Sequence, residues 1–186
     1  MRLYIRNMVC NRCIMAVENV LKSLDIKYLS VTLGEVEVGE EPAAETLSQL
    51  DDKLQAIGFE IIEDKKSQLI ERIKTEIVYL VHHSGEVLNT NLSVWLSGKL
   101  HYDYTYLSNL FSEVEGTTIE KYYIAQRIEK VKELLVYDEF TLLQIADMLG
   151  YSSAAYLSGQ FKKVTGFTPS HYKDIKENKR RSLDQL

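Results

Sequence analysis

The chain has 186 residues, 45% of them hydrophobic, which is enough apolar material for folded domains and argues against intrinsic disorder. Its formal net charge is −5, but the acidic excess lies in residues 1–64, with 6 basic and 12 acidic side chains, whereas residues 119–186 carry 11 basic and 9 acidic ones. No apolar run of about eighteen residues and no secretory signal occur, so we expect a cytoplasmic protein without a membrane segment, whose C-terminal part alone is attracted to phosphate.

Residues 1–64 have the pattern of a small α+β domain. Short β-prone runs alternate with segments of helical spacing. In chain order these predict a strand at 3–5, a helix at 13–24, strands at 28–33 and 35–38 joined at Gly34, a helix at 44–57 and a strand at 59–62. This order predicts a ferredoxin-like β-α-β-β-α-β sandwich, with one antiparallel sheet and two helices.

The chain contains two cysteines, Cys10 and Cys13, in the loop between the first predicted strand and the first predicted helix. This spacing is poor for a structural disulfide but suits a paired thiol site. The positive N-terminal end of a helix favours the thiolate form of Cys13. Two thiolates satisfy Cu(I) or Hg(II), whereas Zn(II) needs four ligands. We therefore expect a site for Cu(I) or another soft metal ion, with Zn(II) less favoured.

This segment resembles the heavy-metal-associated domain of copper chaperones and metal-transporting ATPases. The resemblance covers residues 3–62 and depends on Met8-x-Cys10-x-x-Cys13 and on a Gly-Phe pair before the last strand. It implies that both cysteines bind Cu(I), Zn(II) or a similar soft ion, and that Met8 packs inside the domain. Asn7 stands where the family usually has glycine.

Two other interpretations of the cysteine pair stay open. A Cys-x-x-Cys motif at a helix start is also typical of thiol-disulfide redox enzymes. However, the usual tryptophan before the pair and the proline within it are absent, and Pro42 falls in a loop. Alternatively, the cysteines are reduced thiols without a function, in a domain kept for dimerisation or another signal. We favour metal or thiol sensing, and we predict that the chain is not an enzyme.

Residues 65–84 predict one amphipathic helix, which forms a linker segment over 65–86. Its apolar side chains have coiled-coil spacing and are Ile70, Ile73, Ile77 and Leu80. Because the helix is too short for an independent coiled coil, we expect it to pack against the C-terminal domain, and a homodimer contact stays open. His82 and His83 are neighbours that face different directions, so we expect them to cap the helix rather than bind a metal.

Residues 87–175 contain a helix-turn-helix pattern twice. The first copy predicts a helix at 92–100 and, after residues 101–103, a second helix that contains 106–111 and ends near Gly116. The second copy predicts a helix after Thr141, a turn at Gly150 and a helix from Ser153. The segment 106–111 aligns with 156–161, and the glycines at 116 and 166 follow at the same distance. An amphipathic helix at 119–136 joins the two copies.

This region resembles the DNA-binding domain of the AraC family of bacterial transcription regulators. The resemblance covers residues 88–173 and is strongest in the second copy, at 145–152 and 161–173. It implies two helices that enter successive major grooves of double-stranded DNA, with transcription activated or repressed nearby and RNA polymerase as a further partner. Arg127 matches the arginine usual in the linker helix of this family and is counted among the DNA-binding candidates.

Positions in the family pattern imply the DNA contacts. The base-facing candidates are Tyr104, Thr105, Ser108 and Asn109 in the first copy and Ser153, Ala154, Ala155 and Ser158 in the second. Asn109 suits adenine, and the alanines suit a thymine methyl group. The candidates for phosphate contacts are Lys162, Lys163 and Lys173, and the basic tail at 176–186 either touches DNA or is solvated.

The combined prediction is a metal or thiol sensor joined to a DNA reader. The alternative is a metal-binding chaperone or transfer protein whose helical C-terminal half binds another protein.

Overall fold

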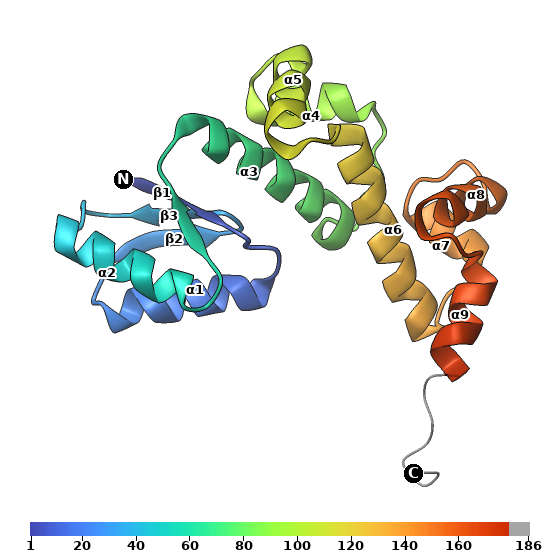
Figure 1. The fold of residues 1–186 in the computed structure, drawn as a ribbon, viewed down its shortest axis with the longest axis horizontal. Helices are drawn as coiled ribbons and strands as arrows, with labels where there is room; N and C mark the ends of the chain where they lie inside the picture. Colours follow the sequence, from blue (N-terminus) through green and yellow to red (C-terminus); the bar gives the residue numbers. More distant parts are fainter. Residues whose placement is uncertain (179–186) are drawn as a thin grey trace, which may run out of the picture. The chain divides into compact units, whose positions relative to one another are not determined.

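The computed structural model describes residues 1–178 and contains two compact units, which meet in the sequence between Tyr79 and Leu80 (Figure 1). We call them the N-terminal unit and the C-terminal unit, and each is described by itself. The predicted basic tail at 176–186 lies outside the described residues from Lys179 onward. Among the described helices, none has the length and apolar character needed to cross a membrane.

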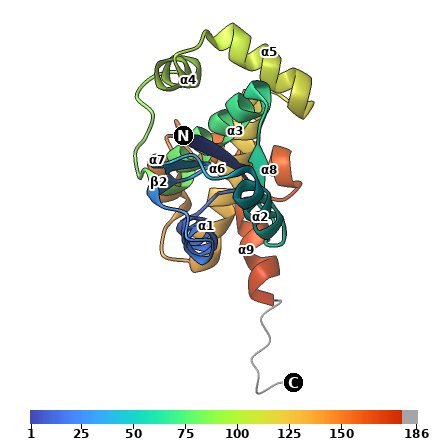
Figure 2. The same ribbon diagram turned by 90° about the vertical axis from the view of Figure 1, so that its left-hand side faces the viewer.

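The N-terminal unit contains a four-stranded antiparallel sheet with the strand order β2-β3-β1-β4. Its elements are β1 (Arg2–Arg6), α1 (Asn11–Ser23), β2 (Tyr28–Thr32), β3 (Glu35–Val38), α2 (Ala44–Gln55) and β4 (Glu60–Ile62). Helices α1 and α2 lie side by side along one face of the sheet (Figures 1 and 2). The succession of strands and helices is the one predicted from the sequence.

The core of the N-terminal unit lies between the sheet and these two helices. Alternation along β1 directs Leu3 and Ile5 inward, and α1 and α2 contribute the leucines and valines of their apolar stripes. Met8, three residues beyond Ile5, is only 1% exposed and belongs to the same core. Its thioether therefore packs inside the unit, as expected, and is not presented to a ligand.

The segment after β4 differs from the predicted linker. It forms α3 (Lys65–Val78) and then a π-helical turn, η1 (Tyr79–His83), and α3 belongs to the N-terminal unit. The Nε2 atom of Gln68 donates a hydrogen bond of 2.9 Å to the backbone oxygen of Ile62, and Asp64 caps the helix. The spacing of apolar residues predicted the helix correctly. It could not predict which unit α3 packs against, because that depends on side-chain contacts with other elements.

The C-terminal unit is helical. Its helices are α4 (Leu92–Leu100), α5 (Tyr104–Glu115), α6 (Ile119–Tyr137), α7 (Leu142–Met148), α8 (Ala154–Thr165) and α9 (Pro169–Asn178). The pair α4–α5 lies at one end of α6, and α7, α8 and α9 lie toward the other (Figure 1). Two helix-turn-helix pairs are therefore joined by one long helix.

The two pairs repeat the same packing. Phe111 of α5 and Phe161 of α8 are fully buried, and each contacts a tyrosine of the following helix, with ring centres 5.7 Å and 5.5 Å apart. Gly116 and Gly166 end the two helices with φ angles of 66° and 82°, which glycine adopts without strain. The sequence repeat thus corresponds to a structural repeat.

Candidate functional site

The start of α5 is set by its capping residue. His101 ends α4 in the left-handed conformation, with φ 60°, and turns the chain toward Asp103. The carboxylate of Asp103 accepts a hydrogen bond of 2.8 Å from the backbone nitrogen of Thr105. A capping carboxylate satisfies backbone N–H groups that have no partner within the helix, and so fixes where α5 begins.

The start of α8 is set in a similar way. The hydroxyl of Ser153 accepts a hydrogen bond of 3.0 Å from the backbone nitrogen of Tyr156, and Gly150 makes the preceding turn with φ 68°. A Cβ atom at Gly150 would lie 2.7 Å from Cγ1 of Val87. Both the backbone conformation and this close approach therefore require glycine in the turn. Ser153, predicted to face a base, is used as a helix cap.

The predicted base-facing residues differ in how available they are. Thr105 and Asn109 of α5 and Ala155 of α8 are exposed. The half-buried members of the set are Ser108, Ala154 and Ser158.

Tyr104 is engaged inside the unit. Its hydroxyl donates a hydrogen bond to the carboxylate of Glu120 at the start of α6. Burial and this neighbouring carboxylate raise the pKa of Tyr104 above its usual value, and the same hydrogen bond lowers the pKa of Glu120. The structure thus gives this predicted base-facing hydroxyl a partner within the protein.

The two helices that follow the turns differ in charge. Lys162 and Lys163 lie exposed in the last turn of α8, whereas α5 carries Glu113 and Glu115 and no basic residue. Lys173 of α9, a predicted phosphate contact, forms an ion pair with Asp138 at the end of α6. Of the two helices that follow the turns, α8 therefore carries the positive charge.

Arg127 of α6 packs within the C-terminal unit. Its Nη2 donates a hydrogen bond of 2.6 Å to the backbone oxygen of Leu149, and its guanidinium lies 3.7 Å from the ring centre of Tyr151. Its buried Nε has no hydrogen-bond partner among the described residues. Arg127 thus ties α6 to the turn before α8, and its predicted contact with DNA stays a prediction.

His82 contacts α6 at Gln126, the residue before Arg127. Its Nε2 lies 3.0 Å from Oε1 of Gln126. Burial lowers the pKa of His82, and the charge of Lys130 acts in the same direction, while Gln126 and Glu133 oppose the shift. The contact with α6 is one that the expected helix-capping role did not include.

This lowered pKa predicts a pH dependence of stability. The unfolded chain protonates His82 near the ordinary value of about 6.5, so the unfolded state binds more protons than the folded state just below that pH. The free energy of unfolding should therefore fall as the pH drops through about 6.5 and level off below the folded pKa. Urea unfolding from pH 8 to pH 5, followed by the fluorescence of Trp95 in the C-terminal unit, measures this. His82→Gln should flatten the profile, and equal slopes for the two proteins would contradict the assignment.

The two cysteines meet at the start of α1. Cys10 is the capping residue, and its Sγ lies 3.4 Å from Sγ of Cys13. The backbone N–H and the thiol of Cys13 lower the pKa of Cys10, although burial opposes them. Both cysteines are half-buried free thiols, so the loop holds a pair of thiols that solvent reaches.

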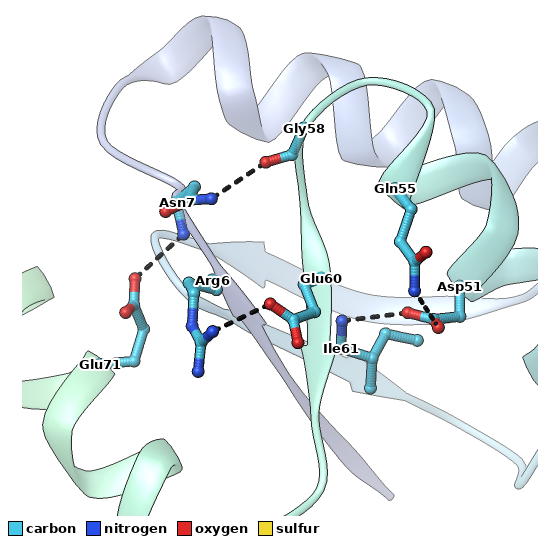
Figure 3. A network of polar contacts seen from close by, with 8 residues as sticks. All are labelled: Arg6, Asn7, Asp51, Gln55, Gly58, Glu60, Ile61 and Glu71. Carbon is cyan, nitrogen blue, oxygen red and sulfur yellow. Dashed lines mark hydrogen bonds and ion pairs between the residues drawn. The ribbon is translucent and has the colours of Figure 1, made fainter. Parts of the chain in front are cut away.

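The chain enters this loop through Asn7, which has φ 73°. Asparagine tolerates this left-handed conformation better than most residues, which explains how it replaces the glycine expected by resemblance. Its side-chain Nδ2 donates a hydrogen bond of 3.1 Å to the backbone oxygen of Gly58, and its backbone nitrogen donates one of 3.1 Å to Oε1 of Glu71 (Figure 3). No pattern in the sequence distinguishes Glu71 from other helical glutamates.

The donor set fits a soft ion with few ligands. Within residues 1–178, no cluster of three or more His, Cys, Asp or Glu side chains could hold a metal. Cys10 and Cys13 could hold a soft ion such as Cu(I) as two thiolates, whereas Zn(II) would need further ligands.

Comparison with known proteins bears on the C-terminal unit. A family model described as a helix-turn-helix domain matches residues 96–175. The uncharacterized HTH-type transcriptional regulator YtdP of Bacillus subtilis is 28% identical over 108 residues, which is 58% of this chain and 14% of that protein. The xylose operon regulatory protein of Escherichia coli K12 is 35% identical over 69 residues, or 37% of this chain and 18% of that protein. The chain thus matches less than a fifth of the length of either relative.

Solved structures agree. The C-terminal domain of AraT, a response regulator from Geobacillus stearothermophilus, has a TM-score of 0.52 and 25% identity, covering 60% of this chain and 88% of that one. A DNA-binding transcriptional dual regulator from Escherichia coli K-12 shares the fold, with a TM-score of 0.50 and 21% identity over 59% of this chain and 93% of its own. These relatives are regulators and not enzymes, in agreement with the prediction. The C-terminal unit therefore contains a helix-turn-helix domain that is similar to those of transcriptional regulators.

Proposed function

We propose that the chain is a sequence-specific DNA-binding transcription regulator of AraC type, and that its N-terminal unit responds to a soft metal ion or to the oxidation state of Cys10 and Cys13. The observation that carries the DNA-binding part is the repeated pair of capped helices, α5 and α8, set along one rigid helix, α6. An α-helix fits the major groove, and helix-turn-helix pairs read half-sites about one turn of DNA apart.

The exposed side chains suggest how each helix reads DNA. Asn109 offers an amide that pairs with adenine through two hydrogen bonds, a contact that contributes about 1–3 kcal/mol of discrimination. Ala155 has no hydrogen-bonding group in its side chain and can contact the thymine methyl group. The proposal is therefore that α5 supplies hydrogen-bonded specificity and α8 supplies apolar specificity together with the positive charge.

The lysines of α8 give a testable result. Replacing Lys162 or Lys163 by glutamine should weaken binding about equally for all sequences and reduce the slope of log affinity against log salt by about 1 per lysine, because each phosphate contact releases counterions. Lys132→Gln is the matched control, since Lys132 is paired with Glu129 at 2.6 Å on α6. Fluorescence anisotropy with one labelled duplex over a salt series measures the slopes. Equal changes in all three variants would show that α8 has no special role.

The thiol pair supports the sensing part of the proposal. Cys10 and Cys13 would hold the ion as two thiolates, and the bound ion would supply a bond to each sulfur that fixes the loop. Oxidation gives a related constraint: with glutathione disulfide as the oxidant, the two thiols lose their protons and form one S–S bond, and two glutathione thiols are released.

One experiment tests both parts. The full chain is used to select bound sequences from random duplex DNA under reducing conditions, with and without Cu(I), and in parallel with the Cys10→Ser plus Cys13→Ser variant. We expect one enriched site, and an affinity that Cu(I) changes by about fivefold or more in the wild type alone. If no duplex is enriched, the DNA-binding part is wrong, and transfer of Cu(I) to an acceptor would then favour the metal-delivery alternative. If the variant keeps the full response to Cu(I), the sensing part is wrong.

A further inference from the structure

Glu71 is a charged side chain in an apolar position. It lies on α3 and is 7% exposed, which makes it the buried charged residue of the described chain. Charged side chains are rarely this buried unless they are hydrogen-bonded, because the loss of solvation must be offset. One of its contacts is the hydrogen bond of 3.1 Å that Oε1 accepts from the backbone nitrogen of Asn7 (Figure 3).

This contact lies at the entrance of the thiol loop. Asn7 holds a left-handed conformation that few residues adopt, and its side chain is bonded to Gly58 on the opposite side. Met8, which follows, is buried in the core. Two residues before the turn at Cys10 are therefore held in place. Asn7 is held by α3 and by the loop before β4, and Met8 is held by the core.

We propose that Glu71 is a positioning residue for the Cys10–Cys13 site, and that it transmits changes in this loop to α3. This inference rests on the proposed function and adds the contact by which the thiol loop is joined to α3 within the N-terminal unit. Glu71 acts through the backbone of Asn7 and touches neither sulfur.

A purely structural role can be separated from this one. Gln68 lies three residues earlier on α3 and fastens the helix to the backbone oxygens of Ile62 and Glu63, at 2.9 Å and 3.2 Å. These bonds attach α3 to the unit at the end of β4, apart from the entrance of the thiol loop. Gln68→Ala is therefore a matched control for loss of a helix anchor.

The test measures alkylation of Cys10 by iodoacetamide as a function of pH, in the reduced, metal-free full chain, with the modified peptide quantified by mass spectrometry. Glu71→Asp keeps the charge but shortens the side chain, so the contact with Asn7 is lost. Glu71→Gln removes the charge but keeps an oxygen that accepts the bond. We expect Glu71→Asp and Glu71→Ala to slow alkylation at neutral pH by about threefold or more, because the loop no longer holds the Cys13 N–H against the Cys10 sulfur. Glu71→Gln and Gln68→Ala should stay within about twofold of the wild type.

The pair of Asp and Gln variants keeps the test decisive even if Glu71→Ala does not fold. If alkylation follows the charge, so that Gln changes the rate and Asp does not, or if neither changes it, the inference is wrong. This readout requires neither metal nor DNA. A normal alkylation profile in Glu71→Asp, together with Cu(I)-dependent DNA binding that needs both cysteines, would reject the role of Glu71 and leave the proposed function intact.

Discussion

Replacing Phe161 by alanine is expected to destabilise the C-terminal unit by about 3–5 kcal/mol. Phe161 is fully buried on α8 and meets the ring of Tyr172 edge to face, with ring centres 5.5 Å apart. The substitution removes the apolar ring that is buried on folding, and it leaves a cavity where the ring packed. Domains of this size have a total stability of about 5–15 kcal/mol, so this loss is a large share of it. The second helix-turn-helix should therefore unfold at a clearly lower temperature than in the wild type, and DNA binding should be lost with it.

Val164→Ala is the matched control for this substitution. Val164 lies on the same helix and is 47% exposed, so its removal should change stability by no more than about 0.5 kcal/mol. Urea unfolding followed by circular dichroism, together with hydrogen exchange of the α8 amides, measures both variants. A Phe161→Ala protein as stable as Val164→Ala would show that α8 does not pack as described.

Replacing Arg127 by alanine is expected to cost about 2–4 kcal/mol of stability in the absence of DNA. The variant loses the hydrogen bond to the backbone oxygen of Leu149 and the stacking on Tyr151. Arg127→Lys should restore only a small part of the loss. An ammonium group is not planar, so it cannot stack on the ring of Tyr151 and donate a hydrogen bond to Leu149 at the same time.

The same unfolding measurement distinguishes a structural arginine from one that contacts DNA. Trp95 in α4 is the single tryptophan of the chain, so its fluorescence reports on the C-terminal unit of the full-length protein. A stability within about 0.5 kcal/mol of the wild type, combined with weaker DNA binding, would favour the DNA contact predicted from the sequence over a structural role. Lys132→Ala, on the same helix, controls for loss of a positive charge.

The sequence predicted the helix-turn-helix pairs well because their signals are local. A turn glycine, a capping serine and a buried aromatic at fixed spacing each determine structure within a few residues, as Gly150, Ser153 and Phe161 show. The burial of Met8 was also predicted correctly, but from the resemblance to heavy-metal-associated domains and not from a local signal.

Long-range polar contacts could not be read from the sequence. In the sequence, Glu71 resembles any surface glutamate of an amphipathic helix. Its hydrogen bond joins it to Asn7, which is 64 positions away in the chain. Tyr104 and Lys173 were assigned to DNA by their position in a pattern, but Glu120 and Asp138 engage them. Such partners come from other helices, and no periodicity encodes them.

The pairing of β1 with β4 brings Tyr4 opposite Ile62, whereas the C-terminal unit packs mainly through helices that are neighbours in the chain. Contacts between distant residues form slowly, because a long loop has to close before they contribute. During refolding, the helical unit should therefore acquire its structure first. The entrance of the thiol loop, which needs Gly58 and Glu71 in place, should be completed late, so both sulfur atoms stay open to oxidants until the sheet has closed.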